Sequence, residues 1–204
     1  MPIVLKNKIL FKRYFMNLLI IGKSRCGKTM LSNMICSRIA GYSKISIDNL
    51  KNSFKKVFPE LDIGFSKNAG NEKFNQFLID YFDSNIYKDN KNGIYYIIEG
   101  AGLDEQTIID LSQKKNTRVI FLGKVSLLPQ DYFYQIRQYE NIYDYGGWTK
   151  RLDDETLLNW CTDWIKKGKE YKSFAEKNGF EFYDTSFEQV EVLNKIVESL
   201  SKNV

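Results

Sequence analysis

The chain lacks histidine altogether, which excludes histidine catalysis and histidine metal sites. Cysteine is scarce: Cys26, Cys36 and Cys161 are scattered over 204 residues at a spacing that suits no metal. An odd number of scattered thiols is typical of a reducing compartment, so we expect a cytoplasmic protein. No apolar run approaches the ~18 residues that a membrane-spanning helix needs, so no membrane partner is expected.

The remaining composition is that of an ordinary folded domain. Hydrophobic residues make up 43% of the chain, and its length suits one domain with a sizeable core. The formal net charge of +5 suits ligands that carry phosphate, although it is common among proteins. Residues 1–15 mix basic and apolar side chains without the features of a signal peptide. We expect an N-terminal extension there, either an added strand or the product of a start codon upstream of Met16. A basic amphipathic membrane contact is the alternative.

The segment Gly22–Thr29, GKSRCGKT, fits the pattern G-x-x-x-x-G-K-[ST] at every fixed position. Its two glycines allow backbone angles that side chains would forbid, so the loop can wrap a phosphate with its N–H groups. Lys28 places a positive charge near the β- and γ-phosphates, and Thr29 offers a hydroxyl to Mg²⁺.

The setting of this loop strengthens the prediction. A short apolar strand, Asn17–Ile21, leads in, and a helix at Met30–Ile39 leads out with its positive N-terminus towards the loop. A structural turn is the alternative. The nucleoside triphosphate site is predicted to comprise Gly22, Lys23, Ser24, Arg25, Cys26, Gly27, Lys28, Thr29 and Met30.

Short apolar segments separated by helical patterns predict a parallel sheet with helices on both faces, within one α/β domain. The predicted strands are Asn17–Ile21, Lys44–Ile47, Ile94–Glu99, Arg118–Leu122 and Phe180–Asp184.

Two long intervals interrupt this alternation. Residues 49–93 contain a predicted helix at Glu72–Asn85, and residues 124–179 contain one at Gln130–Glu140. A glycine-containing loop, Asn141–Lys150, follows the second of these helices. Asp153 is then expected to cap a long helix that stops at Asn178-Gly179. Trp160 and Trp164 on this helix are expected in the core, with a ligand platform as the alternative.

Several motifs together resemble the P-loop small-molecule kinases, the superfamily of nucleoside, nucleotide, shikimate and antibiotic kinases. The resemblance covers nearly the whole chain from Met16 and is carried by Gly22–Thr29, Ile47-Asp48, Ile98-Glu99-Gly100, Arg137–Arg151 and Tyr183-Asp184-Thr185-Ser186. It implies a three-layer P-loop NTPase fold with five strands in the order 2-3-1-4-5. It further implies a kinase domain over residues 16–204, with an acceptor-binding region at 49–93 and a closing lid at 124–153.

Asp48 is expected at the carboxyl end of the second strand, where ligands bind in open α/β sheets. In the resembling kinases that phosphorylate alcohols, an aspartate here often takes the acceptor's proton. The resemblance therefore implies a catalytic role for Asp48 and a hydroxyl acceptor. A magnesium ligand and a helix cap are the alternatives. Glu99, which ends the third strand, is predicted to hold Mg²⁺ through water, and an acceptor contact or an exposed turn carboxylate are its alternatives.

The lid of such a kinase excludes water and brings cations to the phosphates. Lys28, Arg137 and Arg151 are the expected catalytic cations, and Lys150 is a further candidate. The two arginines suit phosphate because the planar guanidinium makes paired hydrogen bonds to it. A solvated helix face is the alternative. Arg25 is expected to point to solvent or over the nucleotide. The resemblance places Asp184-Thr185-Ser186 beside the nucleotide base, and a cap for the last helix is the alternative.

These features predict an ATP-dependent, Mg²⁺-requiring phosphotransferase acting on a small molecule, with a hydroxyl acceptor such as a nucleoside. The alternatives are a nucleoside monophosphate kinase and a P-loop ATP-binding protein with a regulatory or toxin-like role. An enzyme that processes nucleic-acid ends would need a basic groove with stacking aromatics, for which no spacing gives support, so nucleic acid is not expected as a partner. A GTP-driven switch is disfavoured because Asn90–Gly93 lacks the aspartate of N-K-x-D.

Overall fold

The computed structural model describes residues 16–65, 70–114, 116–143 and 147–202 of the chain. The expected extension at residues 1–15 and the centre of the predicted loop at Asn141–Lys150 therefore lie outside the described residues. The strands are β1 (Asn17–Gly22), β2 (Tyr42–Ser46), β3 (Tyr95–Gly100), β4 (Thr117–Gly123) and β5 (Glu181–Asp184). The α-helices are α1 (Lys28–Arg38), α2 (Ile47–Val57), α3 (Glu72–Lys91), α4 (Glu105–Ser112), α5 (Pro129–Tyr143), α6 (Asp154–Asn178) and α7 (Gln189–Lys202), with short 3₁₀ helices at Pro59–Leu61 and Trp148–Arg151.

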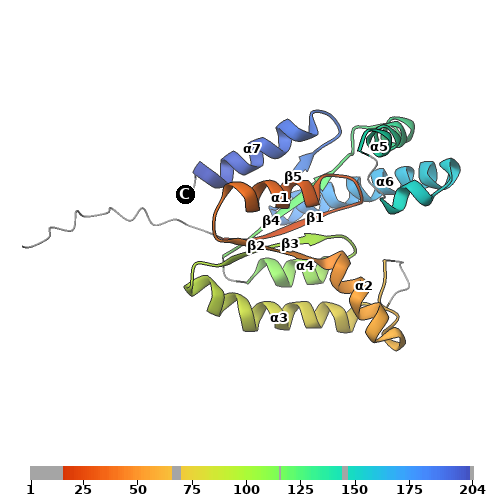
Figure 1. Cartoon of the computed structure of the whole chain (residues 1–204). Coiled ribbons are helices and arrows are strands. Elements are labelled where there is room, and N and C mark those ends of the chain that lie inside the picture. Colours follow the sequence, from red (N-terminus) through yellow and green to blue (C-terminus); the bar gives the residue numbers. More distant parts are fainter. Residues whose placement is uncertain (1–15, 66–69, 115, 144–146, 203–204) are drawn as a thin grey trace, which may run out of the picture.

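The strands form one parallel sheet in the order β2-β3-β1-β4-β5 (Figure 1), which confirms the predicted topology. The central strand β1 pairs with β3 and with β4, so that Leu19 lies beside Ile98 on one side and Val119 on the other. All six residues of β1 are buried. Because the carboxyl ends of parallel strands meet at one edge, the loops that follow the strands gather there.

Helices cover both faces of the sheet. Figure 1 shows α1 and α7 above it and α2, α3 and α4 below it. The pleat of β1 explains how one strand serves both layers: Leu18 and Ile20 pack in the core beneath α1 and α7, while Leu19 and Ile21 pack in the opposite core. A nearly continuous apolar strand is typical of a parallel sheet that is covered on both faces.

A third hydrophobic core lies between α5 and the first half of α6. It consists of Leu127, Tyr132, Ile136, Leu157, Cys161, Trp164 and Ile165. The long helix α6 begins and ends as predicted: the Asp153 carboxylate accepts a hydrogen bond from the Thr156 N–H at 2.8 Å, and Gly179 has a left-handed φ of 69°. Its second half packs against the sheet through Tyr171, Phe174 and Ala175.

Most predicted boundaries differ from the structure by one to three residues, and two boundaries and one burial affect the argument. The strand β2 ends at Ser46, and Ile47 and Asp48 already belong to α2, because the Ser46 side chain accepts a hydrogen bond from the Asn49 N–H and caps that helix. The helix α3 continues past Asn85 to Lys91. Trp164 is buried as expected, but Trp160 is 38% exposed.

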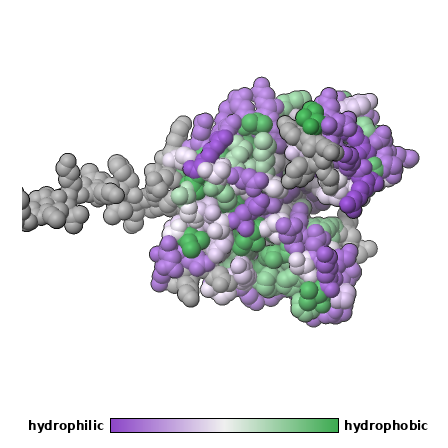
Figure 2. Space-filling model, viewed as in Figure 1, coloured by the Kyte–Doolittle hydropathy of each residue, from purple (hydrophilic) through white to green (hydrophobic). Residues whose placement is uncertain are grey.

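Figure 2 shows hydrophilic residues over most of the upper half of the molecule and hydrophobic patches in the lower half, where α2 and α3 lie. Val57 and Phe58 at the end of α2 are exposed hydrophobic residues. None of the helices in the described part of the chain is long and apolar enough to cross a membrane.

Lys51 is a buried cation in the layer below the sheet. Its side chain lies on α2 and is 1% exposed. The ammonium donates to the Gly102 carbonyl at 2.7 Å and the Gly64 carbonyl at 3.3 Å, and lies 5.5 Å from the ring centres of Phe65 and Phe74. Burial lowers the pKa of Lys51 to about 8, although nearby aspartates oppose this shift. The lysine therefore links α2 to the turn after β3, and burying its charge costs free energy of desolvation.

Because this cost applies only while Lys51 is charged, the free energy of unfolding should depend on pH. Between pH 8 and about 10, the unfolded chain keeps the Lys51 proton that the folded chain has lost, so the unfolded state binds more protons and stability rises with pH. We therefore expect the free energy of unfolding of the wild type to rise relative to that of Lys51→Met across this range, in urea titrations at several pH values. Lys55→Met, at an exposed position of the same helix, controls for the loss of a charge. A difference that does not change with pH would contradict the desolvation of Lys51.

Candidate active site

The segment Gly22–Thr29, the phosphate loop, leaves β1 at the carboxyl edge of the sheet and enters α1. Gly27 has a left-handed φ of 102°, which glycine adopts without steric cost. Gly22 is packed so closely that a Cβ atom there would lie 2.6 Å from the Cys26 Sγ. The first turn of α1 contains no acidic side chain, and its N-cap makes no side-chain hydrogen bond. The N–H groups of this turn are thus left for an anion.

Lys28, Thr29 and Glu99 form a polar group beside this loop. The Lys28 ammonium donates to the Lys23 carbonyl at 2.9 Å. The Thr29 hydroxyl lies 3.4 Å from each carboxylate oxygen of Glu99, which is 4% exposed. Burial raises the pKa of Glu99, and the positive charge of Lys28 opposes this shift. Hydroxyl and carboxylate oxygens are the ligands that Mg²⁺ prefers, so the Thr29–Glu99 pair fits an ion that keeps several waters.

Asp48 lies at the turn that follows Glu99. Its Oδ1 accepts a hydrogen bond from the Ala101 N–H at 3.1 Å, and a Cβ atom on Gly100 would lie 3.1 Å from the same oxygen. The negative charge of Asp48 also raises the pKa of Glu99, as expected for neighbouring carboxylates. The structure thus brings these two predicted site residues together. Interpreting Asp48 as the helix cap is wrong, because Ser46 occupies that position.

The loop after β5 supports the phosphate loop from the side of β4. The Thr185 hydroxyl donates to the Cys26 carbonyl at 2.9 Å, and the Lys124 ammonium donates to the Thr185 carbonyl at 2.9 Å. The Asp184 carboxylate accepts a hydrogen bond from the Ser126 hydroxyl at 2.5 Å. Asp184 therefore holds the loop between β4 and α5. The contact of residues 184–186 with a nucleotide base stays a prediction.

A pocket of about 270 Å³ opens between the phosphate loop and α5. Lys124 lines it and is 7% exposed, and burial lowers the pKa of its ammonium to about 8. Lys124 was not among the predicted site residues, although its position directly after β4, at the carboxyl edge of the sheet, was a usable signal. The pocket residues that α5 supplies form no sequence motif, so they could not be predicted. The pocket is lined by Arg25, Gly27, Lys28, Thr29, Met30, Lys124, Tyr132, Gln135, Ile136, Tyr139 and Gln189.

Arg137 lies in a polar network between α5 and the segment Gly147–Leu152. Its guanidinium donates to Glu140 at 3.0 Å, to Asp154 at 2.7 Å and to the Leu152 carbonyl at 2.8 Å. Sequence analysis did not foresee this network, because its members are distributed over α5, the 3₁₀ helix and α6. In this arrangement Arg137 joins the predicted lid segments to one another, and its role towards phosphate stays a prediction.

The other predicted cations have different surroundings. Lys150 and Arg151 are exposed at the end of the 3₁₀ helix, and no hydrogen bond or ion pair joins Arg151 to another described residue. The Arg25 side chain is 23% exposed and donates to Thr149 and, at 3.5 Å, to Glu140. It points towards the predicted lid, a direction that the sequence had left open.

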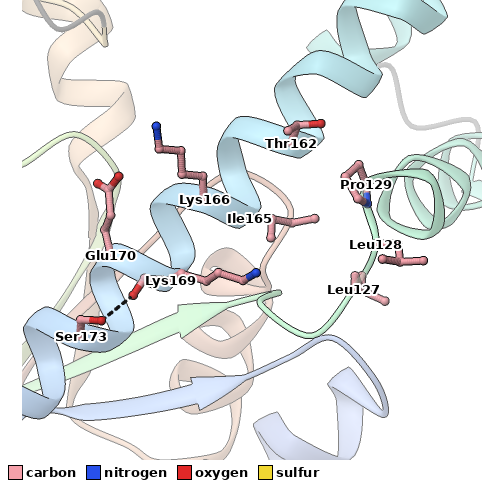
Figure 3. Close-up of a pocket in the computed structure, with 9 residues that line it drawn as sticks. All are labelled: Leu127, Leu128, Pro129, Thr162, Ile165, Lys166, Lys169, Glu170 and Ser173. Carbon is pink, nitrogen blue, oxygen red and sulfur yellow. Dashed lines mark hydrogen bonds between the residues drawn. The ribbon is translucent and has the colours of Figure 1, made fainter.

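A second and larger cavity, about 570 Å³, lies apart from this site. Figure 3 shows Ile165 and Lys169 pointing from α6 towards the loop before α5, while Lys166 and Glu170 point away on another side of the helix. No phosphate-loop residue lines it, so we do not include it in the candidate site. Its lining residues are Leu127, Leu128, Pro129, Thr162, Ile165, Lys166, Lys169, Glu170 and Ser173.

Solved structures resemble this fold over nearly their whole length. A gluconokinase from Sinorhizobium meliloti 1021 has a TM-score of 0.57 at 12% sequence identity, with 94% of each chain covered. A shikimate kinase from Bacteroides thetaiotaomicron has a TM-score of 0.58 at 14% identity, covering 92% of this chain and 98% of its own. A shikimate kinase from Acinetobacter baumannii, in complex with shikimate, has a TM-score of 0.53 at 12% identity and covers 94% and 96%.

No protein-family model matches the sequence, and neither does any curated protein. At such low identity the likeness speaks for the fold and not for the reaction. The order of the five strands, the helices on both faces and the phosphate loop after β1 agree with it. The chain therefore has the fold of the P-loop small-molecule kinases.

Proposed function

We propose that this protein is an ATP-dependent kinase that phosphorylates a hydroxyl group of a small molecule. The observation that carries the proposal is the convergence of the phosphate loop with two carboxylates, Asp48 and Glu99, at one edge of the sheet. The solved structures of similar fold support it, since their titles name a gluconokinase and shikimate kinases. Three free thiols fit the reducing cytoplasm that we propose as its location.

Each residue has a role that its position supports. The N–H groups of the phosphate loop and the Lys28 ammonium would bind and neutralise the phosphates. Thr29 would hold Mg²⁺ directly and Glu99 through water; when bound, the ion neutralises charge that develops on the phosphates. Asp48 would accept the proton of the acceptor hydroxyl.

In the transfer step, the acceptor oxygen forms a bond to the γ-phosphorus while the bond to the β–γ bridging oxygen breaks, and ADP leaves. The protein's part is to align the two reactants and exclude water, which would otherwise accept the phosphoryl group. Arg151, exposed beside the lid network, is the proposed additional cation for the transferred group; Arg137 would contribute after rearrangement of its present bonds. A screen of ATP consumption against sugars, hydroxy acids, nucleosides, nucleotides and aminoglycosides would identify the acceptor.

Removal of the phosphate-loop charge tests nucleotide binding. Lys28→Ala should weaken ATP binding and lower turnover by at least about 10²-fold, because a cation at the transferred phosphate is lost. The fold should survive, since Lys28 donates only within its own loop. Calorimetric titration of an ATP analogue into both proteins measures the change in affinity. Lys56→Ala, at an exposed position of α2, is the control. Equal affinity and turnover would contradict the assignment of the loop.

The role of Asp48 separates an alcohol acceptor from a phosphate acceptor, which needs no base. Asp48→Asn keeps the shape and an oxygen for the Ala101 N–H but removes the base. Turnover should fall by about 10²–10⁴-fold while ATP affinity stays nearly unchanged. Steady-state kinetics with the acceptor from the screen would measure both. Unchanged turnover would exclude the base and favour a nucleoside monophosphate acceptor.

The role of Glu99 is tested by magnesium titration. If Glu99 holds the ion through water, Glu99→Gln should raise the Mg²⁺ concentration for half-maximal activity by about 10- to 100-fold, and high Mg²⁺ should restore much of the rate. Glu60→Gln, at an exposed position of the 3₁₀ helix Pro59–Leu61, controls for the loss of a negative charge. If Glu99 instead contacts the acceptor, the acceptor's KM should rise and added Mg²⁺ should not restore the rate.

A further inference from the structure

Arg25 connects the phosphate loop to a segment more than a hundred residues further along the chain. Its Nη2 donates to the Thr149 hydroxyl and lies 3.5 Å from a carboxylate oxygen of Glu140. The Thr149 hydroxyl donates in turn to the same carboxylate, whose other oxygen accepts from Arg137 at 3.0 Å. A chain of polar contacts thus runs from the phosphate loop through the 3₁₀ helix to α5.

The middle of this chain is buried, so its contacts are shielded from water. Thr149 is 0% exposed and Glu140 is 2% exposed. A buried carboxylate needs partners to offset its lost hydration, and Glu140 finds them in two arginines and a hydroxyl. Removing one partner would therefore affect the other contacts of the chain.

The backbone at Gly147 packs directly against the guanidinium of Arg25. A Cβ atom on Gly147 would collide with Nη2 and lie 3.2 Å from Cζ of Arg25. Gly147 has φ −60° and ψ 144°, angles that alanine also adopts, so an added methyl group would be opposed by the guanidinium in its present place and not by the backbone conformation. The Arg25 Nε is buried without a hydrogen-bond partner among the described residues, and the side chain also lines the pocket beside Lys28 and Thr29.

We propose that Arg25 is a positioning residue that couples the nucleotide pocket to the segment Gly147–Leu152. One edge of its guanidinium holds Thr149 and Glu140, while the rest of the side chain borders the space where the phosphates would lie. An anion in the pocket attracts the same guanidinium, so nucleotide binding changes the position of the segment. Because such coupling is reciprocal, the docked segment in turn favours nucleotide binding. The second half of this proposal rests on the proposed function, whereas the docking through Arg25 does not.

The chain carries its own spectroscopic reporter for this contact. All three tryptophans, Trp148, Trp160 and Trp164, pack together, with ring centres 5.2 to 6.0 Å apart. Trp148 precedes Thr149 in the 3₁₀ helix, while the other two lie on α6. Tryptophan fluorescence therefore reports on the position of the segment against α6.

The test compares Arg25→Met, Arg25→Lys and Gly147→Ala with the wild type. Without ligand, Arg25→Met and Gly147→Ala should change the tryptophan emission and speed amide hydrogen exchange in residues 147–152. With the ATP analogue, both should weaken binding by about tenfold, the worth of a hydrogen bond to a charged group, and abolish the fluorescence response. Arg25→Lys keeps the charge and should restore part of both. Arg38→Met, which removes an exposed arginine bonded to Asn194, should behave as the wild type.

The double variant Arg25→Met/Gly147→Ala decides whether the two residues act through one contact. Once the guanidinium is gone, the added methyl group meets no obstacle, so the double variant should be no worse than Arg25→Met. Additive losses, or a wild-type emission and exchange pattern in Arg25→Met, would overturn the proposal. If the wild type binds no nucleotide, the proposed function fails and the coupling to nucleotide fails with it. The ligand-free measurements then still decide the docking through Arg25.

Discussion

The parallel pairing of β1 with both β3 and β4 is the constraint on which the candidate site depends. This pairing brings the ends of three strands to one edge, and each end supplies a different chemical group. The phosphate loop follows β1, Glu99 comes from β3, and Lys124 follows β4. None of the three is near another in sequence, and a shift of register by one residue would turn Glu99 to the opposite face of the sheet. The chemistry therefore rests on backbone hydrogen bonds in the centre of the sheet.

Buried charge is the second theme of the site. Lys51, Lys124 and Glu99 are each almost fully buried. Burial lowers the pKa of the two lysines and raises the pKa of the glutamate, and so favours the neutral form of each group. Such groups cost stability, and they occur here beside the loops that a ligand would contact. Backbone carbonyls accept from both lysines, so the cations also fix the loops that carry these carbonyls. The buried charges near the site therefore include candidate catalytic groups and groups that hold loops in place.

The fold was largely predictable because its signals are local. Four consecutive apolar residues before a glycine-rich loop, or Asp153 before a helical pattern, can be recognised without knowledge of distant residues. The end of β2 was misplaced by one residue, because Ile47, the first residue of α2, is apolar and was assigned to the strand. The sequence also predicted roles for the phosphate loop and Glu99, and the structure places the Glu99 carboxylate beside the Thr29 hydroxyl.

The contacts of Arg25 and Arg137 could not be predicted in this way. Their partners Glu140, Thr149 and Asp154 lie on separate elements, and only the packing of α5 on α6 brings them together. Trp160 was expected in the core. The helix extends beyond the sheet at this point, however, and leaves the ring partly in water.

The core between α5 and α6 is separate from the two cores that cover the sheet. The 25 residues of α6 belong to two cores: Leu157 and Cys161 pack against α5, whereas Phe174 and Ala175 pack against the sheet. Buried Gly168 lies between these two parts of the helix. The outer core shares no residue with the two cores that cover the sheet, so α5 and the first half of α6 are held together by apolar contacts of their own. A substitution in the outer core would thus alter the packing of α5 on α6 without removing any apolar contact of the sheet.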